Sequence, residues 1–110
     1  MSVMLEPIVG RYTTFAIQGK QCRVYFEEAG SGIPLVCLHT AGADNRQYRH
    51  MMNDAEITSR YRVIAFDMPW HGKSYPPEGW QDTEYKLSTA LYVDTVMAFC
   101  AALDSSAIAR

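Results

Sequence analysis

The chain has 110 residues, a formal net charge of -2 and 48% hydrophobic residues, which is the composition of a globular protein with room for one core. It carries neither a basic patch nor a long acidic block, so nucleic acid is not an expected partner. No stretch approaches the ~20 apolar residues of a membrane span or forms a signal-peptide core, which excludes a membrane partner and favours a cytoplasmic location.

Three cysteines are spread widely along the chain, at Cys22, Cys37 and Cys100. Their number is odd and no C-x-x-C spacing occurs, so the sequence predicts neither a disulfide framework nor a zinc site. A reducing compartment fits this usage.

The first part of the chain predicts a β-hairpin. Residues 11–18 and 21–30 are rich in aromatic and β-branched residues, and they meet at Gln18-Gly19-Lys20, where Gly19 can adopt the positive φ of a tight turn. The segment "GSG" at 30–32 then ends this unit.

The next elements alternate between strand and helix. Residues 33–39 ("IPLVCLH") and 61–67 ("YRVIAFD") are short apolar runs of the kind found in strands covered on both faces. Between them, residues 45–60 have helical character with Asp44 as N-cap, although Asn53-Asp54 weakens the continuation.

The last segment predicts a loop and a long helix. Residues 69–79 contain three prolines and two glycines, which exclude regular structure there. Residues 84–104 carry a wide apolar stripe at helical spacing, which favours a helix lying against a sheet. The alternation of elements predicts an α/β fold with right-handed crossovers and a largely parallel sheet.

Two motifs, "LVCLHTAG" at 35–42 and "VIAFDMPWHGKS" at 63–74, resemble the α/β-hydrolase superfamily. In that family one strand ends in a His-Gly-x turn and the next ends in a D-x-P-G-H-G-x-S loop. The resemblance implies that residues 1–110 form the N-terminal part of an α/β-hydrolase sheet, with a hairpin (1–30) and the start of the β/α core (33–110, β-α-β-α). It also implies that the chain is truncated before the nucleophile strand.

The resemblance gives the turn at residues 39–42 a role in acyl transfer. In the family a backbone N–H of this turn stabilises the negative oxygen of the tetrahedral intermediate. We assign this oxyanion donor to Ala41, with Thr40 and Gly42 as alternatives, while His39 anchors the turn by hydrogen bonding. The alternative interpretation is an ordinary strand-to-helix turn whose small residues permit close packing.

Ser74 comes within one residue of the G-x-S-x-G pattern of a serine nucleophile, because Gly72-Lys73-Ser74-Tyr75 is followed by Pro76 in place of glycine. A nucleophile elbow passes directly into a helix, and Pro76-Pro77 prevents a clean helix start. The sequence therefore predicts that Ser74 is not the nucleophile.

The family's use of this loop is structural. By resemblance, Asp67 and Ser74 bond the backbone of the turn, and His71 and Gly72 shape the neighbourhood of the oxyanion donor. Trp70 stands where the family usually has glycine, which places a bulky ring near the pocket, either for substrate shape or for packing.

Other patterns carry no site. Three histidines and Asp67 lack the paired spacing of metal ligands, so no metal site is expected (His39, His50 and His71). Four arginines interspersed with acidic residues indicate a solvated helix surface (Arg46, Arg49, Arg60 and Arg62).

Two functions of different classes follow. The first is the N-terminal part of a cofactor-independent hydrolase acting on small organic esters, amides or related carbonyl compounds. The family's serine, acid and histidine come later in the chain, so the 110 residues alone are expected to be inactive. The second is a non-catalytic short protein or interaction module that completes its sheet with a strand from a partner chain.

Overall fold

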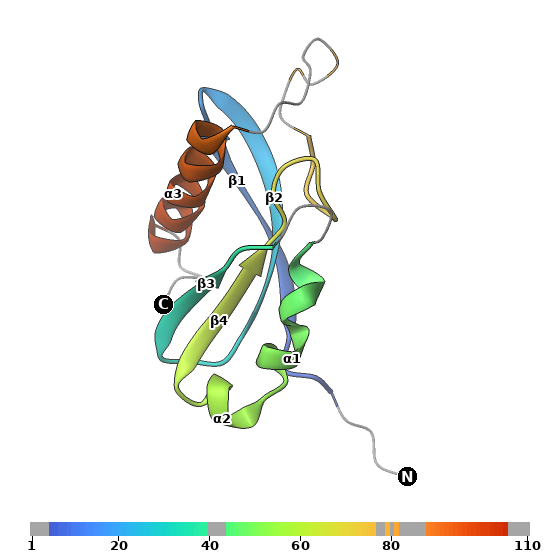
Figure 1. Cartoon of the computed structure of the whole chain (residues 1–110), viewed down its shortest axis with the longest axis vertical. Coiled ribbons are helices and arrows are strands. Elements are labelled where there is room, and N and C mark those ends of the chain that lie inside the picture. The colour runs from blue at the N-terminus through green and yellow to red at the C-terminus, as the bar shows by residue number, and fades with distance from the viewer. Residues whose placement is uncertain (1–4, 40–43, 77–78, 80, 82–87, 106–110) are drawn as a thin grey trace.

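The computed structural model describes residues 5–39, 44–76, 79, 81 and 88–105. These residues form one four-stranded sheet with helical segments on both faces (Figure 1). The strands are β1 (Val9–Ile17), β2 (Lys20–Ala29), β3 (Ile33–Cys37) and β4 (Tyr61–Phe66). The helical segments are η1 (Asn45–Tyr48), α1 (Arg49–Met52), α2 (Ala55–Thr58) and α3 (Thr89–Ser105).

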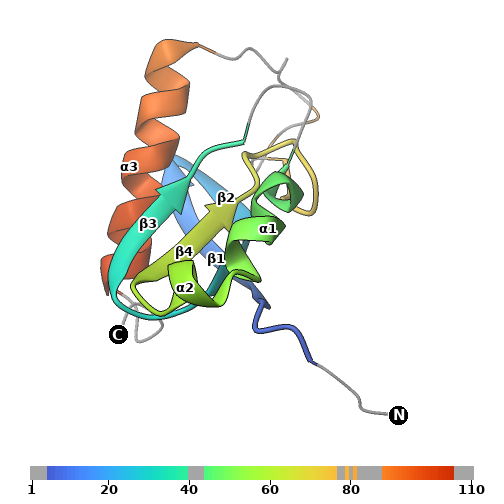
Figure 2. The same ribbon diagram turned by 60° about the horizontal axis from the view of Figure 1, so that its bottom comes forward.

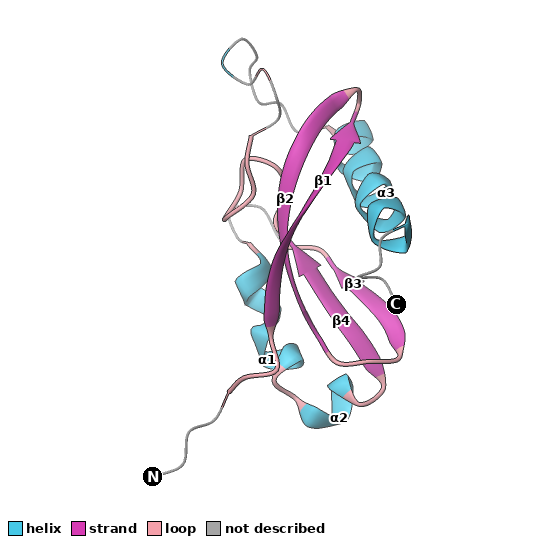
Figure 3. Cartoon of the chain, turned by 180° about the vertical axis from the view of Figure 1, so that it is seen from behind, coloured by secondary structure: helices cyan, strands magenta, loops and turns pink. Residues whose placement is uncertain are grey.

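The predicted hairpin is confirmed as β1 and β2, which pair antiparallel from Val9↔Glu28 to Ile17↔Lys20. Its two-residue loop has Gln18 at φ 50° and Gly19 at φ 80°. Positive φ at both central positions is the geometry of a type I′ turn, whose twist matches that of the strands. The long hairpin reaches well beyond the ends of β3 and β4 (Figure 3).

The prediction of a largely parallel sheet is wrong for the described chain. The strand order is β1-β2-β4-β3, and only β3 and β4 pair parallel. β4 pairs antiparallel with β2, from Phe26↔Phe66 to Ala29↔Val63. The sheet is therefore mixed, because the hairpin adds two antiparallel neighbours to a single parallel pair.

The predicted helical character of residues 45–60 is confirmed, and the weakened continuation at Asn53-Asp54 is a complete break. A 3-10 turn and two one-turn helices occupy this range, as Figure 2 shows from below. Asp44 caps the first by accepting the N–H of Arg46 at 2.9 Å, while Asp54 accepts the N–H groups of Glu56 and Ile57 and so begins a new helix. A cap residue in the middle of the range favours a restart over continuation.

Side chains alternate across the sheet, so that it has two apolar faces. On one face Phe99 of α3 packs against Phe26 and Phe66, with ring centroids 5.6 and 4.3 Å apart. On the other, Met52 covers Val63 and Ala65. The architecture is a three-layer α/β/α arrangement. The predicted helix at 84–104 corresponds to α3, although its expected first turn at 84–87 lies outside the described residues.

The sheet has an uncovered side at β3. This strand pairs with β4 alone among the described strands, and Ile33 on it is 66% exposed. Val93 and Met97 of α3 are 50% and 64% exposed. Apolar side chains therefore remain exposed both at a free strand edge and on α3.

Candidate functional site

The candidate site lies at the carboxyl ends of β3 and β4. These strands are parallel and pair Cys37 with Ala65, so the segments that follow them emerge side by side. In α/β sheets, binding sites form at this end of the parallel strands. The structure describes every residue of the loop after β4, residues 67–76.

The side chain of His39 connects the segment after β3 with the loop after β4. Its imidazole is buried, and Nε2 accepts the backbone N–H of Met68 at 3.0 Å, which requires this nitrogen to be unprotonated. Its ring also lies against that of His71, with centroids 5.0 Å apart. The end of β3 is thereby fixed to the loop after β4.

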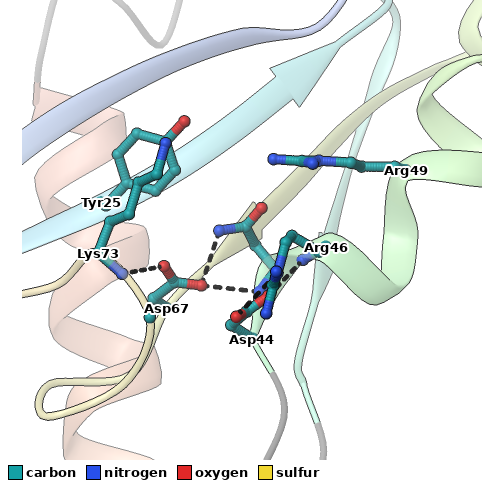
Figure 4. A pocket seen from close by; sticks show the side chains of 8 residues that line it. Tyr25, Asp44, Arg46, Arg49, Asp67 and Lys73 are labelled. Atoms are coloured by element: carbon teal, nitrogen blue, oxygen red, sulfur yellow. Dashed lines mark hydrogen bonds and ion pairs between the residues drawn. The ribbon is translucent and has the colours of Figure 1, made fainter.

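The carboxylate of Asp67 stabilises the loop after β4 by hydrogen bonds to backbone N–H groups. Its fully buried carboxylate accepts three hydrogen bonds: from the backbone N–H and the side-chain amide of Asn45, both at 2.7 Å, and from the N–H of Lys73 at 2.9 Å (Figure 4). These donors satisfy a charge that would be costly to bury alone. Asp67 therefore connects the start of η1 with the far side of its own loop.

Ser74 inserts its hydroxyl between the loop and β2. Its Oγ accepts the N–H of Tyr25 at 2.9 Å and donates to the backbone oxygen of Asp67 at 2.6 Å. On either side, Asp67 donates to Tyr25 and Tyr75 donates to Arg23 through backbone bonds of 2.9 Å each. The serine thus continues the β2 to β4 pairing where β4 ends. Ser74 is 8% exposed, and its hydroxyl already donates one hydrogen bond and accepts another, so it is not placed to attack a substrate.

Two loop residues have positive φ. Gly72 is at φ 50°, and a Cβ there would lie 2.3 Å from Oδ2 of Asp67, so only glycine fits. Trp70 is at φ 75°, where a non-glycine residue is strained, and its side chain is half-buried. This conformation gives a physical reason for glycine at the same position in the family motif.

The structure brings together five of the residues singled out in the sequence, which lie within the two segments at the strand ends (His39, Asp67, His71, Gly72 and Ser74). The oxyanion assignment to Ala41, with Thr40 and Gly42 as alternatives, falls outside the described residues. It stays a prediction, as does the role of Trp70 near a substrate.

The sequence analysis did not predict an ion pair beside this loop, which joins the buried Glu27 to the partly exposed Arg49. Glu27 of β2 is 3% exposed, receives two bonds from Arg49 at 3.0 and 2.8 Å, and accepts the hydroxyl of Tyr25 at 2.8 Å. Burial raises the pKa of the Glu27 carboxyl, but the bonds from Arg49 and Tyr25 outweigh it, so the pKa is lowered. Burial and the bond to Glu27 raise the pKa of Tyr25.

The prediction of a solvated arginine surface is therefore wrong in part. Arg62 contradicts it, because this residue lies on β4 and pairs with Glu28 at 3.0 Å, with its side chain 11% exposed. Arg49 lies on α1 and pairs with Glu27, but its side chain stays 43% exposed. The available signal was the pair Glu27-Glu28 directly after the apolar run Val24-Tyr25-Phe26 of β2. A carboxylate on a covered face of a sheet needs a cationic partner.

Within the described part of the chain, no group of three or more His, Cys, Asp or Glu side chains is placed to hold a metal ion. Over the same residues, no helix combines the length and the apolar character needed to cross a membrane.

No protein-family model and no curated protein matches the sequence. Solved structures do match. A thermophilic esterase from Thermogutta terrifontis has a TM-score of 0.70 at 18% identity, over 86% of this chain and 32% of that one. A haloalkane dehalogenase from Agrobacterium tumefaciens has a TM-score of 0.61 at 27% identity, over 86% and 29%. An epoxide hydrolase from Vigna radiata has a TM-score of 0.60 at 22% identity, over 94% and 30%.

The described part of the chain has the α/β-hydrolase fold that these structures share, and it matches the N-terminal part of that fold. It spans about 30% of the length of the structures that it matches.

Proposed function

We propose that this chain supplies the N-terminal part of a cofactor-independent hydrolase that acts on small organic esters, amides or related carbonyl compounds. Its contribution is the turn at residues 39–42, with the backbone N–H of Ala41 as oxyanion donor, and the loop that supports this turn. The nucleophile, the base and the orienting acid belong to the remainder of the fold.

One observation carries the proposal. The imidazole of His39 joins the end of β3 to the loop after β4 by its bond from Met68 at 3.0 Å. Asp67 and Ser74 hold that loop against η1 and β2. A donor of an oxyanion hole works because it is fixed before the reaction and needs no reorganisation. His39, the first residue of the proposed turn, is fixed in this way.

The second candidate is an interaction module without catalytic activity. It is favoured by the free edge of β3, by the exposed Ile33 on that strand, and by the exposed Val93 and Met97 on α3. A strand added to this edge by another chain would cover the same surface as a further strand of a hydrolase.

The native mass separates the two proposals. An antibody against the β1–β2 hairpin captures the protein from its source, and intact mass spectrometry measures it. A mass well above 12.4 kDa is expected if the segment is part of a hydrolase, whereas 12.4 kDa would overturn that proposal and leave the module.

The role of the turn is tested in the complete enzyme, which is produced as the wild type and as a variant. Ala41→Pro removes the proposed donor, and the expected result is loss of esterase turnover and a slower reaction with a serine-directed phosphonate, while the circular dichroism spectrum shows that the enzyme stays folded. Unchanged turnover would exclude Ala41 as the donor. The 110-residue chain itself should not react with the phosphonate, and labelling of Ser74 would contradict its structural role.

A further inference from the structure

The free edge of β3 presents backbone groups to a further strand. β3 stands at one end of the sheet order and pairs with β4 alone among the described strands (Figure 2). The N–H of Ile33 donates to the oxygen of Arg60, directly before β4, at 3.1 Å. Because the N–H and C=O groups of successive residues point alternately to the two sides of a strand, Leu35 also faces β4, whereas Pro34 and Val36 face outward.

Pro34 removes one of the outward groups. A proline has no N–H, so within β3 the free edge presents three groups: the C=O of Pro34 and the N–H and C=O of Val36. On an edge strand the missing donor costs nothing while it faces solvent. When another strand is added to this edge, the missing donor lies in the new interface.

The missing donor favours one direction of the added strand. In a parallel strand, one residue donates its N–H to Pro34 and accepts the N–H of Val36, and the second residue after it donates to the C=O of Val36. All three edge groups are used, and the added strand can begin at the first of these residues, with no carbonyl opposite the proline ring. In an antiparallel strand, the residue opposite Pro34 donates its N–H to the proline, but its own C=O meets the ring without a donor. A carbonyl left unpaired in an interface is costly.

The two faces of β3 define the composition of the strand that fits. Leu35 packs against the cluster around Met52 on one face, and Val36 packs against the cluster around Phe99 on the other. Both side chains are only half-buried, and the described strands leave their outer side open. An added strand would cover both, so it buries most apolar area when its side chains are apolar on both faces.

We propose that the free edge of β3 binds an extended, apolar segment of a partner chain in parallel orientation, and that Pro34 sets this direction. The inference rests on the second candidate function and adds the direction and the composition of the partner strand. Two copies of the chain joined at β3 about a twofold axis would pair antiparallel, so the same missing N–H acts against that arrangement.

A peptide with the sequence of β4, residues 61–66 ("YRVIAF"), is a suitable probe, because this strand already pairs parallel with the opposite edge of β3. It carries a nitroxide on an added residue at either its N-terminus or its C-terminus and is titrated into the ¹⁵N-labelled 110-residue chain. In the parallel complex the N-terminal nitroxide broadens the amide signal of Ile33 more strongly than that of Cys37, and the C-terminal nitroxide does the opposite. We expect this orientation to exceed the antiparallel one at least about tenfold, from one unpaired carbonyl. An unshifted amide signal of Val63 shows that β4 itself stays in place.

The other outcomes separate this inference from the function on which it rests. The reverse broadening pattern would mean antiparallel addition, which overturns the inference and leaves the interaction module standing. No saturable shift at residues 33–37 would overturn both. Broadening of these signals by chain concentration alone, if the peptide does not relieve it, would identify a second copy as the occupant and would also overturn the inference.

Pro34→Ala tests the role of the proline directly. Alanine restores the outward N–H, and an antiparallel pair is otherwise slightly the more stable, so the parallel preference should disappear or reverse. Pro7→Ala makes the same substitution in the exposed segment before β1 and should leave the preference unchanged. A parallel preference that persists in Pro34→Ala would show that the proline does not set the direction and would refute the proposal.

Discussion

Replacing Ser74 with alanine tests whether this hydroxyl is structural. The substitution removes the bond of 2.9 Å from the N–H of Tyr25 and the bond of 2.6 Å to the oxygen of Asp67. Each is worth about 1 kcal/mol, and the buried N–H of Tyr25 left without an acceptor costs roughly 1–3 kcal/mol more. We expect the free energy of unfolding to fall by about 3 kcal/mol, a large share of the ~5–15 kcal/mol of a typical domain.

Pulse proteolysis in urea measures this change on small amounts of the chain at low concentration. Ser59→Ala is the matched control, because its hydroxyl makes one bond of 2.8 Å to the oxygen of Glu56 at an exposed helix end. This variant should remain within ~0.5 kcal/mol of the wild type. A Ser74→Ala chain as stable as the Ser59→Ala chain would refute the structural role and reopen the question of the nucleophile.

Three further predictions concern strain, pH and the free edge. Trp70→Gly should be about 1 kcal/mol more stable to urea than Trp70→Ala, because both lose the indole but only glycine accepts φ 75° without strain. The pKa of Glu27 is lowered in the folded chain, so its contribution is present above the ordinary range near ~4.3 and is lost as the pH falls through the lowered value. Glu27→Gln should therefore remove part of the loss of stability in acid. Ile33→Lys should reduce self-association in analytical ultracentrifugation, because the charge blocks the open edge of β3.

Each of these has an outcome that would contradict it. Alanine as stable as glycine at position 70 would show that the positive φ costs nothing. An acid profile unchanged in Glu27→Gln would assign the pH dependence to other carboxyls. Leu5→Lys makes the same substitution at a site 91% exposed outside the sheet, so equal effects at Leu5 and Ile33 would point to net charge and away from the edge.

The sequence was informative wherever one local rule determines the structure. The hairpin follows from a two-residue turn in which Gly19 adopts φ 80°, and β3 and β4 follow from short apolar runs. The break at Asn53-Asp54 was visible, but its consequence was underestimated. A side-chain cap at Asp54 outcompeted the helical continuation suggested by the spacing of Tyr48, Met51 and Met52.

What the sequence could not reveal depends on contacts between distant elements. Nothing local indicates that Glu27 meets Arg49, or that the hydroxyl of Ser74 lies between Tyr25 and Asp67, since these pairings exist only after β4 joins β2. The positive φ of Trp70 could not be predicted either, because it also depends on how the loop packs in the folded chain. Only the glycine of the family motif at that position pointed to a constrained backbone.

The strand order has a consequence for synthesis on the ribosome. β4 lies between β2 and β3 in the sheet but follows both in the chain, so β3 leaves the ribosome with no strand to pair with. The hairpin can form early because its contacts are local, whereas β3 must wait until β4 is inserted. Its apolar residues are exposed during this interval, so the nascent chain is more prone to aggregation before the sheet closes.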